Sequence, residues 1–456
     1  MRKTSTLNKP VTGNRQLATI MKLWQKEGTS TSELIEKFTV GKDKEFDILL
    51  ARYDVQGSIA HVTMLGEVGL MTEEEAATAV KALEEIATEI SSGQFRISSE
   101  AEDVHSQVEF LLTERIGDIG KKIHSGRSRN DQVAVDIKLY LRAEILSIKE
   151  EVKELFDLLI SQSEQYKNIL LPGYTHLQIA MPSSFGLWFG AYAESLVDDL
   201  EMLAAAYRIT NKNPLGSGAG YGSSFPLNRK RTTELLGFES LNYNSVYAQM
   251  TRGKTEKVVA MGLSCIAATL SKLSMDCCLY LNQNFGFISF PSELTTGSSI
   301  MPHKKNPDVL ELIRAKCNRI QSLPNELALL VNNLPSGYHR DLQLTKEILF
   351  PATEELKACL QVARLMLSNM EVKQNILADE KYAYLFSVEA VNSLVNNGVS
   401  FREAYKQVGE QIEKGAFDFD TTKPLAHTHE GSINHLCNDE IITLMNKTLS
   451  QFEAVK

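Results

Sequence analysis

Apolar residues recur at helical spacing over most of the chain from Thr72 onward, and strand-type alternation is scarce. The clearest stripe consists of six aliphatic residues with gaps of 4, 3, 4, 3 and 4, which are Leu141, Ile145, Ile148, Val152, Leu155 and Leu159. This spacing places all six on one face of a helix, and the Lys and Glu residues between them make the opposite face polar. The segment Leu171-Pro172-Gly173 is expected to end this helix.

Four further long helices are predicted from the same spacing, over residues 184–209, 255–284, 308–333 and 341–370. Helices of nearly thirty residues are about 45 Å long and suit a long bundle. Pro324 is expected to kink the helix in which it lies, because proline lacks a backbone donor and clashes with the preceding turn. The helix over 255–284 is apolar nearly all round, which indicates burial on every side and a core shared between subunits. An all-α bundle of long helices is therefore predicted.

Length, charge and cysteine usage narrow the class of protein. A chain of 456 residues is long enough for two or three domains. Its 48 Lys and Arg residues against 57 Asp and Glu residues give a net charge of −9, which argues against a general nucleic-acid-binding surface. No apolar stretch is expected to reach the roughly eighteen residues of a membrane helix, so no membrane association is predicted. Six cysteines without a CxxC pair favour free thiols in a reducing cytosol.

The beginning of the chain is polar and basic and contains no apolar segment of the kind found in secretory signals. We expect residues 1–20 to form a disordered extension. Met21 is a second candidate for the start of translation, and folded structure is expected from about there onward.

The densest cluster of chemically useful side chains is the loop over residues 296–307, with the sequence TGSSIMPHKKNP. Glycine and proline at this density interrupt a helical pattern, and hydroxyl, ammonium and amide groups together suit an anion. A solvated turn with two surface lysines is the simpler interpretation, and it is right for most isolated SS or KK pairs. A mobile loop that closes on an anionic substrate accounts for the whole run, and we favour it.

Three other polar clusters lie where predicted helices begin or end, at residues 124–132, 173–178 and 338–346. The first places Arg129 and Asn130 at a helix N-terminus, where paired guanidinium donors and the helix dipole favour a carboxylate. The alternative is that Ser128 or Asn130 is an N-cap beside solvated arginines. The glycine-rich segment 216–222 does not fit a nucleotide-binding loop and is interpreted as a flexible connector between helices.

Together the motifs HSGRSRNDQ, PGYTHLQ, TTGSSIMPHKKNP and GYHRDLQ resemble those of the argininosuccinate lyases, within the fumarase/aspartase superfamily, and the resemblance runs from about Met21 over nearly the whole chain. It implies an all-α three-domain fold whose long central helical bundles form a twenty-helix core in a homotetramer, with active sites shared between subunits. It also implies a cytoplasmic enzyme of arginine biosynthesis that cleaves argininosuccinate to fumarate and arginine by β-elimination, without a metal or other cofactor. The implied N-terminal helical domain, central bundle and small C-terminal helical domain cover residues 21–126, 127–378 and 379–456.

The resemblance also implies roles for individual residues. Ser298 and His176 are implied as the two proton-transfer residues, one of which accepts a proton while the other donates one. The sequence leaves their order open, and we favour Ser298 as the base and His176 as the group that assists the leaving nitrogen. Glu311 is expected to orient His176. The residues expected to bind the substrate are Arg129, Asn130, Thr175, Lys304, Asn306, Tyr338, Gln343 and Lys346.

Two alternatives remain beside this interpretation. An adenylosuccinate lyase would need a purine and phosphate site, and the YHRDLQ segment argues against it. A structural protein of the same fold, as lens δ-crystallins are, would show damage at Ser298, His176 or Lys304, and all three residues are present. The chain departs from the family pattern at His303, over residues 38–47 and over residues 245–253.

Overall fold

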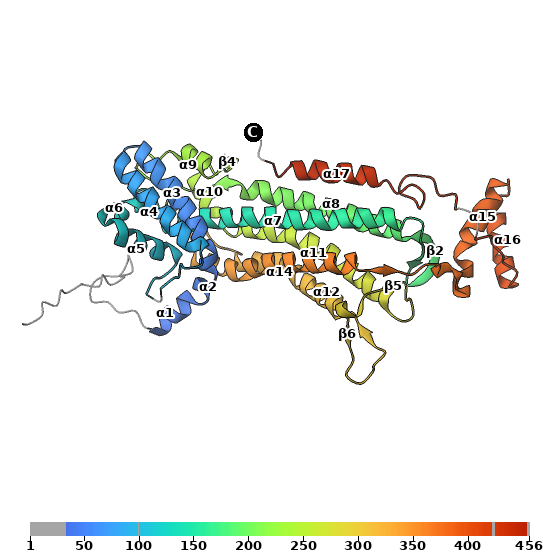
Figure 1. Ribbon diagram of the computed structural model, residues 1–456. Coiled ribbons are helices and arrows are strands. Elements are labelled where there is room, and N and C mark those ends of the chain that lie inside the picture. The colour runs from blue at the N-terminus through green and yellow to red at the C-terminus, as the bar shows by residue number, and fades with distance from the viewer. Residues whose placement is uncertain (1–32, 99, 422–424, 454–456) are drawn as a thin grey trace, which may run out of the picture. The chain divides into compact units, whose positions relative to one another are not determined.

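The structure is a computed structural model that describes residues 33–98, 100–421 and 425–453 (Figure 1). The chain divides into two units, residues 1–125 and 126–456. The predicted extension over residues 1–20 and the candidate start at Met21 lie outside the described residues. The division into three domains stays a prediction.

The first unit is helical. Its longest helices, α3 (Ala51–Glu67), α4 (Glu73–Ser91) and α5 (Val104–Ile116), pack against one another. Helix α4 begins at a capping box in which Thr72 and Glu75 satisfy each other's backbone N–H groups. The shorter helices of this unit are α1 (Glu33–Val40), α2 (Asp43–Asp47), η1 (Ile48–Leu50), α6 (Asp118–Lys121) and η2 (Lys122–His124).

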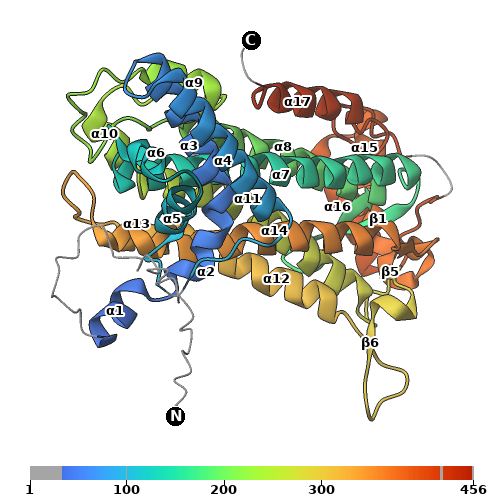
Figure 2. The ribbon, with the colours of Figure 1, turned by 60° about the vertical axis from the view of Figure 1, so that its left-hand side comes forward.

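The second unit is a bundle of helices that lie side by side (Figures 1 and 2). They are α7 (Arg129–Gln165), α8 (Phe185–Thr210), α11 (Lys254–Leu281), α12 (Asp308–Ile320), α13 (Leu323–Leu330) and α14 (Thr345–Ser368). All six aliphatic residues of the predicted stripe lie on α7 and are fully buried. The all-α bundle predicted from the sequence is therefore confirmed.

The end of α7 corrects one prediction. The helix stops at Gln165, and Leu171-Pro172-Gly173 lies in strand β1 (Leu170–Thr175), which pairs antiparallel with β2 (Gln178–Ser184). Proline and glycine therefore shape a hairpin, with an irregularity in register between Pro172 and Tyr174. This connection was not predicted because proline and glycine in β1 and proline in β2 interrupt the alternation that identifies a strand.

The region around Pro324 also differs from expectation. The helix predicted over 308–333 is not kinked at this residue but divided, with α12 ending at Ile320 and α13 beginning at Leu323. Pro324 occupies the first turn of α13, where its missing N–H would have had no helical partner. A proline that was not considered, Pro351, lies inside α14.

Among the described residues α11 is the one helix long and apolar enough to cross a membrane, which corrects the expectation that no stretch reaches that length. Its most apolar window is 56% buried inside the chain. The helix packs against α8, α12, α13 and α14. It is therefore a core helix, although the chain by itself does not cover every side of it.

The remaining elements are short. Strand β3 (Lys212–Asn213) pairs parallel with β4 (Ser240–Leu241), whereas β5 (Ile288–Ser289) with β8 (Glu371–Val372) and β6 (Thr296–Gly297) with β7 (Lys305–Asn306) are antiparallel. The remaining helices are α9 (Arg229–Leu235), α10 (Ser245–Met250), η3 (Ser292–Leu294), η4 (Arg340–Leu344), η5 (Ile376–Ala378), η6 (Glu380–Phe386), α15 (Ser387–Asn396), α16 (Phe401–Glu413) and α17 (Asn438–Ser450).

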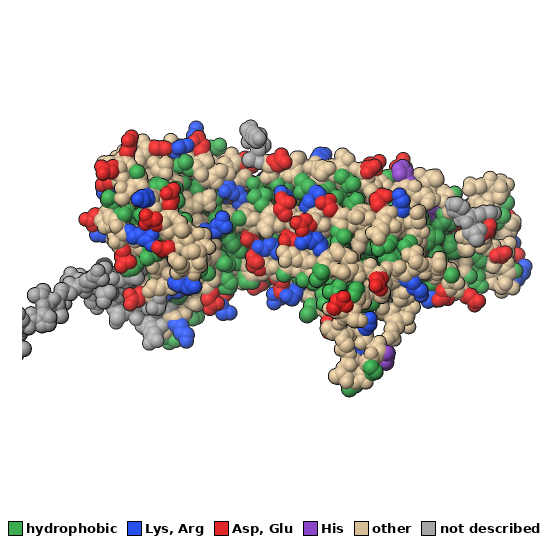
Figure 3. Space-filling view, viewed as in Figure 1, with side chains coloured by type: hydrophobic (Ala, Val, Ile, Leu, Met, Phe, Trp, Pro, Cys, Tyr) green, Lys and Arg blue, Asp and Glu red, His purple; other side chains and the backbone are tan. Residues whose placement is uncertain are grey.

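The C-terminal helices differ in what they pack against. Helices α15 and α16 pack on each other around Val391, Ala404 and Val408. Helix α17 instead lies along α8 of the bundle (Figures 1 and 2). On the face of the molecule in Figure 3, acidic and basic side chains are interspersed, and no basic patch dominates it.

Candidate active site

His176 lies at the tip of the β1–β2 hairpin. Thr175 pairs with Gln178, so His176 and Leu177 form the two-residue turn between the strands. Both have positive φ, +53° and +59°, which a two-residue hairpin turn requires and which Asn-Gly normally supplies. The left-handed conformation costs a residue with a Cβ about 1–2 kcal/mol. Strain at an exposed tip that carries an imidazole is typical of a functional site.

The hairpin is packed firmly up to Tyr174, which pairs with Ile179 next to the turn. The ring of Tyr174 meets Phe285 edge to face at 5.3 Å between centroids. Its hydroxyl lies 3.4 Å from that of Tyr382. The hairpin therefore presents His176 from a fixed support.

Ser298 lies at the start of the loop between β6 and β7. Its Oγ accepts hydrogen bonds from the backbone N–H groups of Ile300, at 3.4 Å, and Met301, at 3.2 Å. Two such donors favour a negatively charged oxygen over a neutral one. The role of Ser298 as the base stays a prediction, and these two hydrogen bonds agree with it.

The same loop is closed by side chains at its base. Asn306 Nδ2 donates to the Gly297 carbonyl at 3.4 Å, and Thr296 Oγ1 donates to Asp308. The loop projects from the body of the unit (Figures 1 and 2), and Ile300 is 82% exposed. Lys304 makes no side-chain hydrogen bond to the described residues, and its predicted part in substrate binding stays a prediction.

Arg129 and Asn130 occupy the first turn of α7. Ser128 is the N-cap: its Oγ accepts from Asn130 N at 3.3 Å, and its own N–H donates to Asp131 Oδ1 at 2.8 Å. The structure thus identifies Ser128, and not Asn130, as the cap. The cap at Ser128 is confirmed, but the arginines beside it are not all solvated, because Arg127 is buried. Capping by Ser128 places Arg129 and Asn130 at the positive end of the helix dipole, and their binding of a carboxylate stays a prediction.

Asp131 is a residue that the sequence analysis did not single out. Its Oδ2 accepts from the N–H groups of Gly216, at 2.9 Å, and Gly218, at 2.8 Å. Burial raises the pKa of Asp131 to about 6, although the backbone hydrogen bonds from Ser128, Gly218 and Gly216 oppose the rise. Its place at N3 of a helix, three residues after a serine, was the signal that could have identified it.

The glycine-rich segment 216–222 is consequently not a loose connector. Gly216 and Gly218 have φ of +82° and +59°, so glycine suits the turn that points their N–H groups at one carboxylate. Arg229 holds the same segment from the other side, donating to the Leu215 carbonyl at 2.9 Å and the Asn242 carbonyl at 2.8 Å. The expectation of a flexible connector is corrected.

The segment that carries Tyr338, Gln343 and Lys346 is attached to the start of α11. Arg252 donates from Nη2 to the Leu342 carbonyl at 3.1 Å and from Nε to Glu256 at 3.0 Å. Lys346 is buried, whereas Tyr338 is exposed and Gln343 is half-buried. Arg252 belongs to the stretch over 245–253 that departs from the family pattern, and here it holds the segment in which substrate-binding residues are predicted.

The structure brings some predicted site residues to one end of the bundle and leaves others apart. The residues at the end where α7 begins are Arg129, Asn130, Tyr338, Gln343 and Lys346. The hairpin with Thr175 and His176 follows the opposite end of α7, whose 37 residues span about 55 Å. A single chain therefore cannot place His176 beside Arg129.

The three predicted catalytic residues are also separate within one chain. Ser298 is on the projecting loop, and Glu311 is exposed in the first turn of α12. The His176 side chain makes no hydrogen bond to any described residue, and so none to Glu311 or Ser298. The predicted orientation of His176 by Glu311 is therefore not formed by a hydrogen bond within this chain.

Comparisons with known proteins agree with this architecture. Residues 26–322 match the model of a protein family described as "Lyase". The chain is 60% identical over 431 residues to the argininosuccinate lyase of Bacteroides fragilis, covering 94% of this chain and 96% of that protein. It is likewise 60% identical over 431 residues to the argininosuccinate lyase of Parabacteroides distasonis, with the same coverage of both chains.

Solved structures extend the comparison to the fold. The chain resembles a crystal structure of EDDS lyase in complex with formate with a TM-score of 0.71, covering 93% of this chain and 91% of that one. At 23% sequence identity this likeness concerns the fold alone.

Proposed function

The chain belongs to the argininosuccinate lyases within the Lyase family, and we propose that it catalyses the reversible β-elimination of L-argininosuccinate to fumarate and L-arginine. The structural observation that carries this proposal is the Ser298 hydroxyl, which accepts two amide hydrogen bonds on an exposed loop. Lys304 and Asn306 lie on the same loop. A carbon–nitrogen lyase needs such a base next to groups that stabilise an anion.

The proposed reaction begins with loss of a proton from the carbon beside a carboxylate. Ser298 takes this proton, and the electron pair is delocalised into the carboxylate as an aci form. Cations and hydrogen-bond donors stabilise that charge best when they are already in place. We assign this task to Lys304, Asn306 and Asn130, with Thr175 and Arg129 nearby.

The second step breaks the bond between carbon and the guanidino nitrogen. The electron pair of the aci form makes the new double bond of fumarate, and the pair of the broken bond goes to the nitrogen. His176 donates a proton to that nitrogen, which completes arginine, and Glu311 orients the imidazole. Tyr338, Gln343 and Lys346 hold the remainder of the substrate.

We further propose a homotetramer in which each site takes residues from three subunits. The separation of Ser298, His176 and Arg129 in one chain supports this assembly. So do exposed methionines on the long helices, since Met202 of α8 and Met261 and Met275 of α11 are 39–46% exposed. Large apolar side chains that are exposed on the surface of a single chain are typical of subunit interfaces.

A cytoplasmic location and a place as the last step of arginine biosynthesis are part of the proposal. All six cysteines are free thiols, which suits a reducing compartment. Arginine is the product that leaves with the protonated nitrogen, so the elimination direction serves synthesis.

One assay tests the proposed activity. Argininosuccinate and adenylosuccinate are offered in parallel to the purified chain, without added metal or cofactor, and fumarate release is followed by its ultraviolet absorbance. We expect release from argininosuccinate alone, with arginine formed in equal amount. Turnover of adenylosuccinate alone would replace the assignment by the neighbouring enzyme, and turnover of neither substrate would favour a structural protein of this fold.

A further inference from the structure

The segment that begins α17 carries three metal-ligand side chains that the elimination chemistry does not use. They are His435, Cys437 and Glu440, and one donor atom from each lies within 4.8 Å of the others. We call these three residues the α17 cluster. His435 and Glu440 are exposed and Cys437 is half-buried, so the cluster is open to an ion from solvent.

The backbone at Cys437 breaks the usual rules for the start of a helix. Cys437 is the N-cap of α17 but lies in the left-handed region, with φ 59° and ψ 32°, and its side chain makes no capping bond. N-caps are normally extended Ser, Thr, Asp or Asn residues. A residue that departs from the usual N-cap type and conformation, without a capping bond in return, is typical of a functional position.

The same position explains why the ligands converge. The side chains of an N-cap and of the third helical residue face each other, as they do in a capping box. Cys437 and Glu440 stand in that relation, and Cys437 Sγ lies 3.7 Å from the carbonyl oxygen of His435. The ligand atoms of all three residues converge to within 4.8 Å of one another.

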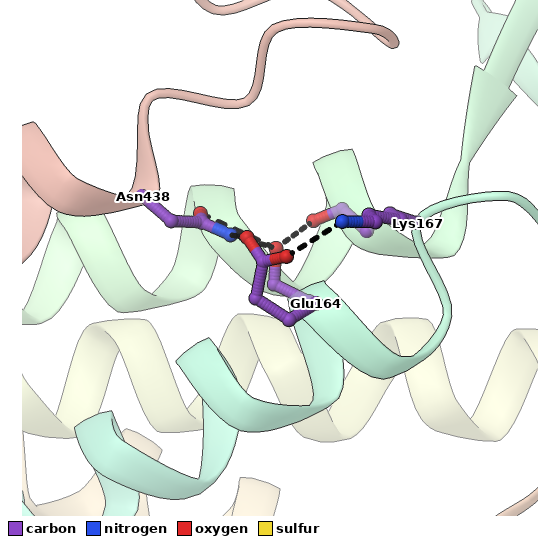
Figure 4. Close-up of polar contacts among 5 residues, drawn as sticks. Glu164, Lys167 and Asn438 are labelled. Carbon is purple, nitrogen blue, oxygen red and sulfur yellow. Dashed lines mark hydrogen bonds and ion pairs between the residues drawn. The ribbon is translucent and has the colours of Figure 1, made fainter.

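The chain between the ligands is fixed to the bundle (Figure 4). Asn438 Nδ2 donates to Glu164 at 2.6 Å and to Ser163 Oγ at 3.0 Å, and Glu164 also accepts from Lys167 at 3.0 Å. Part of the ordering that metal binding requires is therefore already present in the free chain.

The cluster also borders a hollow at the surface. A cavity of about 380 Å³ is lined by residues 433–440 together with Glu164, Lys167 and Asn168 from the end of α7. The ammonium of Lys167 is paired with Glu164 and so is not an isolated positive charge beside the cluster. The hollow has room for a metal ion with a bound water molecule.

We propose that His435, Cys437 and Glu440 bind one zinc ion, with water as the fourth ligand. Thiolate and imidazole donors together select zinc over magnesium or calcium. Zinc–ligand bonds of about 2.0–2.3 Å place tetrahedral donors about 3.3–3.8 Å apart, so rotation of the three side chains suffices to close the site. The Cys437 thiolate and the Glu440 carboxylate balance the charge of the ion. The bound ion would connect the loop before α17 to the first turn of that helix.

The test uses the full chain in a non-chelating phosphine reductant. Zinc affinity is measured by competition with a chromophoric chelator, and cobalt is added separately to detect the charge-transfer absorbance of a cobalt–thiolate bond. The variants are His435→Gln and Cys437→Ser. His429→Gln and Cys265→Ser are matched controls, since they remove the same groups outside the cluster.

We expect one zinc ion per chain, with affinity weakened more than about 100-fold in both cluster variants, because even partners outside the first ligand shell contribute about 10- to 100-fold. The cobalt–thiolate band should vanish in Cys437→Ser and persist in both controls. Circular dichroism shows whether each variant is folded, and His435→Gln tests the site independently of the cysteine. Zinc binding that is absent from the unmodified chain, or that survives both cluster substitutions, overturns the proposal.

Discussion

Ser298 and Ser299 are adjacent hydroxyls in different surroundings. Ser298 Oγ accepts the N–H groups of Ile300 and Met301, whereas the Ser299 hydroxyl makes no hydrogen bond to the described residues. Donors stabilise the form of the oxygen that carries negative charge. The hydrogen bonds thus distinguish the two serines and agree with the prediction from the resemblance that Ser298 is the base.

Ser298→Ala should lower kcat for argininosuccinate by about 10²- to 10⁴-fold, the usual effect of losing a proton-transfer group. Ser299→Ala is the matched control and should retain turnover close to that of the unmodified chain. The measurement is fumarate absorbance under saturating substrate. A loss in Ser299→Ala equal to that in Ser298→Ala would contradict the assignment of the base.

Asp131 provides a pH-dependent prediction. Its pKa is raised from 3.8 to about 6 in the folded chain, so the folded state binds the proton more tightly than the unfolded state. The resulting stabilisation is fully present below about pH 4 and is lost as the pH rises through about 6. The rise corresponds to on the order of 3 kcal/mol.

Asp131→Asn removes this titration. Between about pH 7 and pH 4 the free energy of unfolding of the unmodified chain should therefore rise relative to that of the variant, by on the order of 3 kcal/mol. Urea denaturation of both proteins across this range measures the difference. If the difference stays constant with pH, Asp131 does not titrate as a buried carboxyl.

At the scale of elements, the β1–β2 hairpin combines a packed base with a strained tip. Leu177 is 74% exposed with φ +59°, so its side chain contributes little packing while its backbone is strained. Neighbouring Ile179 lies within strand β2 and is 40% exposed. We therefore expect glycine substitutions at Leu177 and at Ile179 to have opposite effects on the stability of the chain.

Leu177→Gly should stabilise the chain by about 0.5–1 kcal/mol, because relief of about 1–2 kcal/mol of strain exceeds the entropy cost of glycine. Ile179→Gly, the control, should destabilise it. Urea midpoints compare the two, and kcat of Leu177→Gly should fall because a looser tip positions His176 less well. Equal destabilisation by both changes would show that the turn is not strained.

At the scale of the whole molecule, the long helices set the distances between the clusters. Helix α7 alone separates Arg129 from the hairpin that follows its other end. Ser298 and Glu311 belong to a third region, around β6 and α12. This separation is the reason for proposing that neighbouring chains complete each site.

Mixing Ser298→Ala chains with His176→Asn chains should restore activity if a site takes these residues from different subunits. Random assembly of equal amounts leaves about a quarter of the sites with both groups intact. Fumarate release after co-refolding measures the recovery, and native mass spectrometry should show mixed tetramers near four times 50.8 kDa. Mixed tetramers no more active than the sum of the parents would place both residues on one chain, and monomers would refute the assembly.

The features that the sequence determined by itself are formed by residues close together in the chain. The stripe from Leu141 to Leu159 predicted a buried helical face because helical periodicity depends only on spacing within one element. The composition of residues 296–307 predicted an anion-binding loop, and the resemblance implied the family. Ser128 was recognised as a possible cap for the same local reason.

Only the tertiary structure decided the features that join distant residues. Asp131 binds Gly216 and Gly218 across 85 and 87 residues, and Arg252 reaches Leu342 across 90. The early end of α7 and the turn at His176 likewise depend on how the hairpin packs. Such contacts depend on which helices become neighbours, and that outcome reflects the packing of the whole core and not the spacing of residues within any one segment.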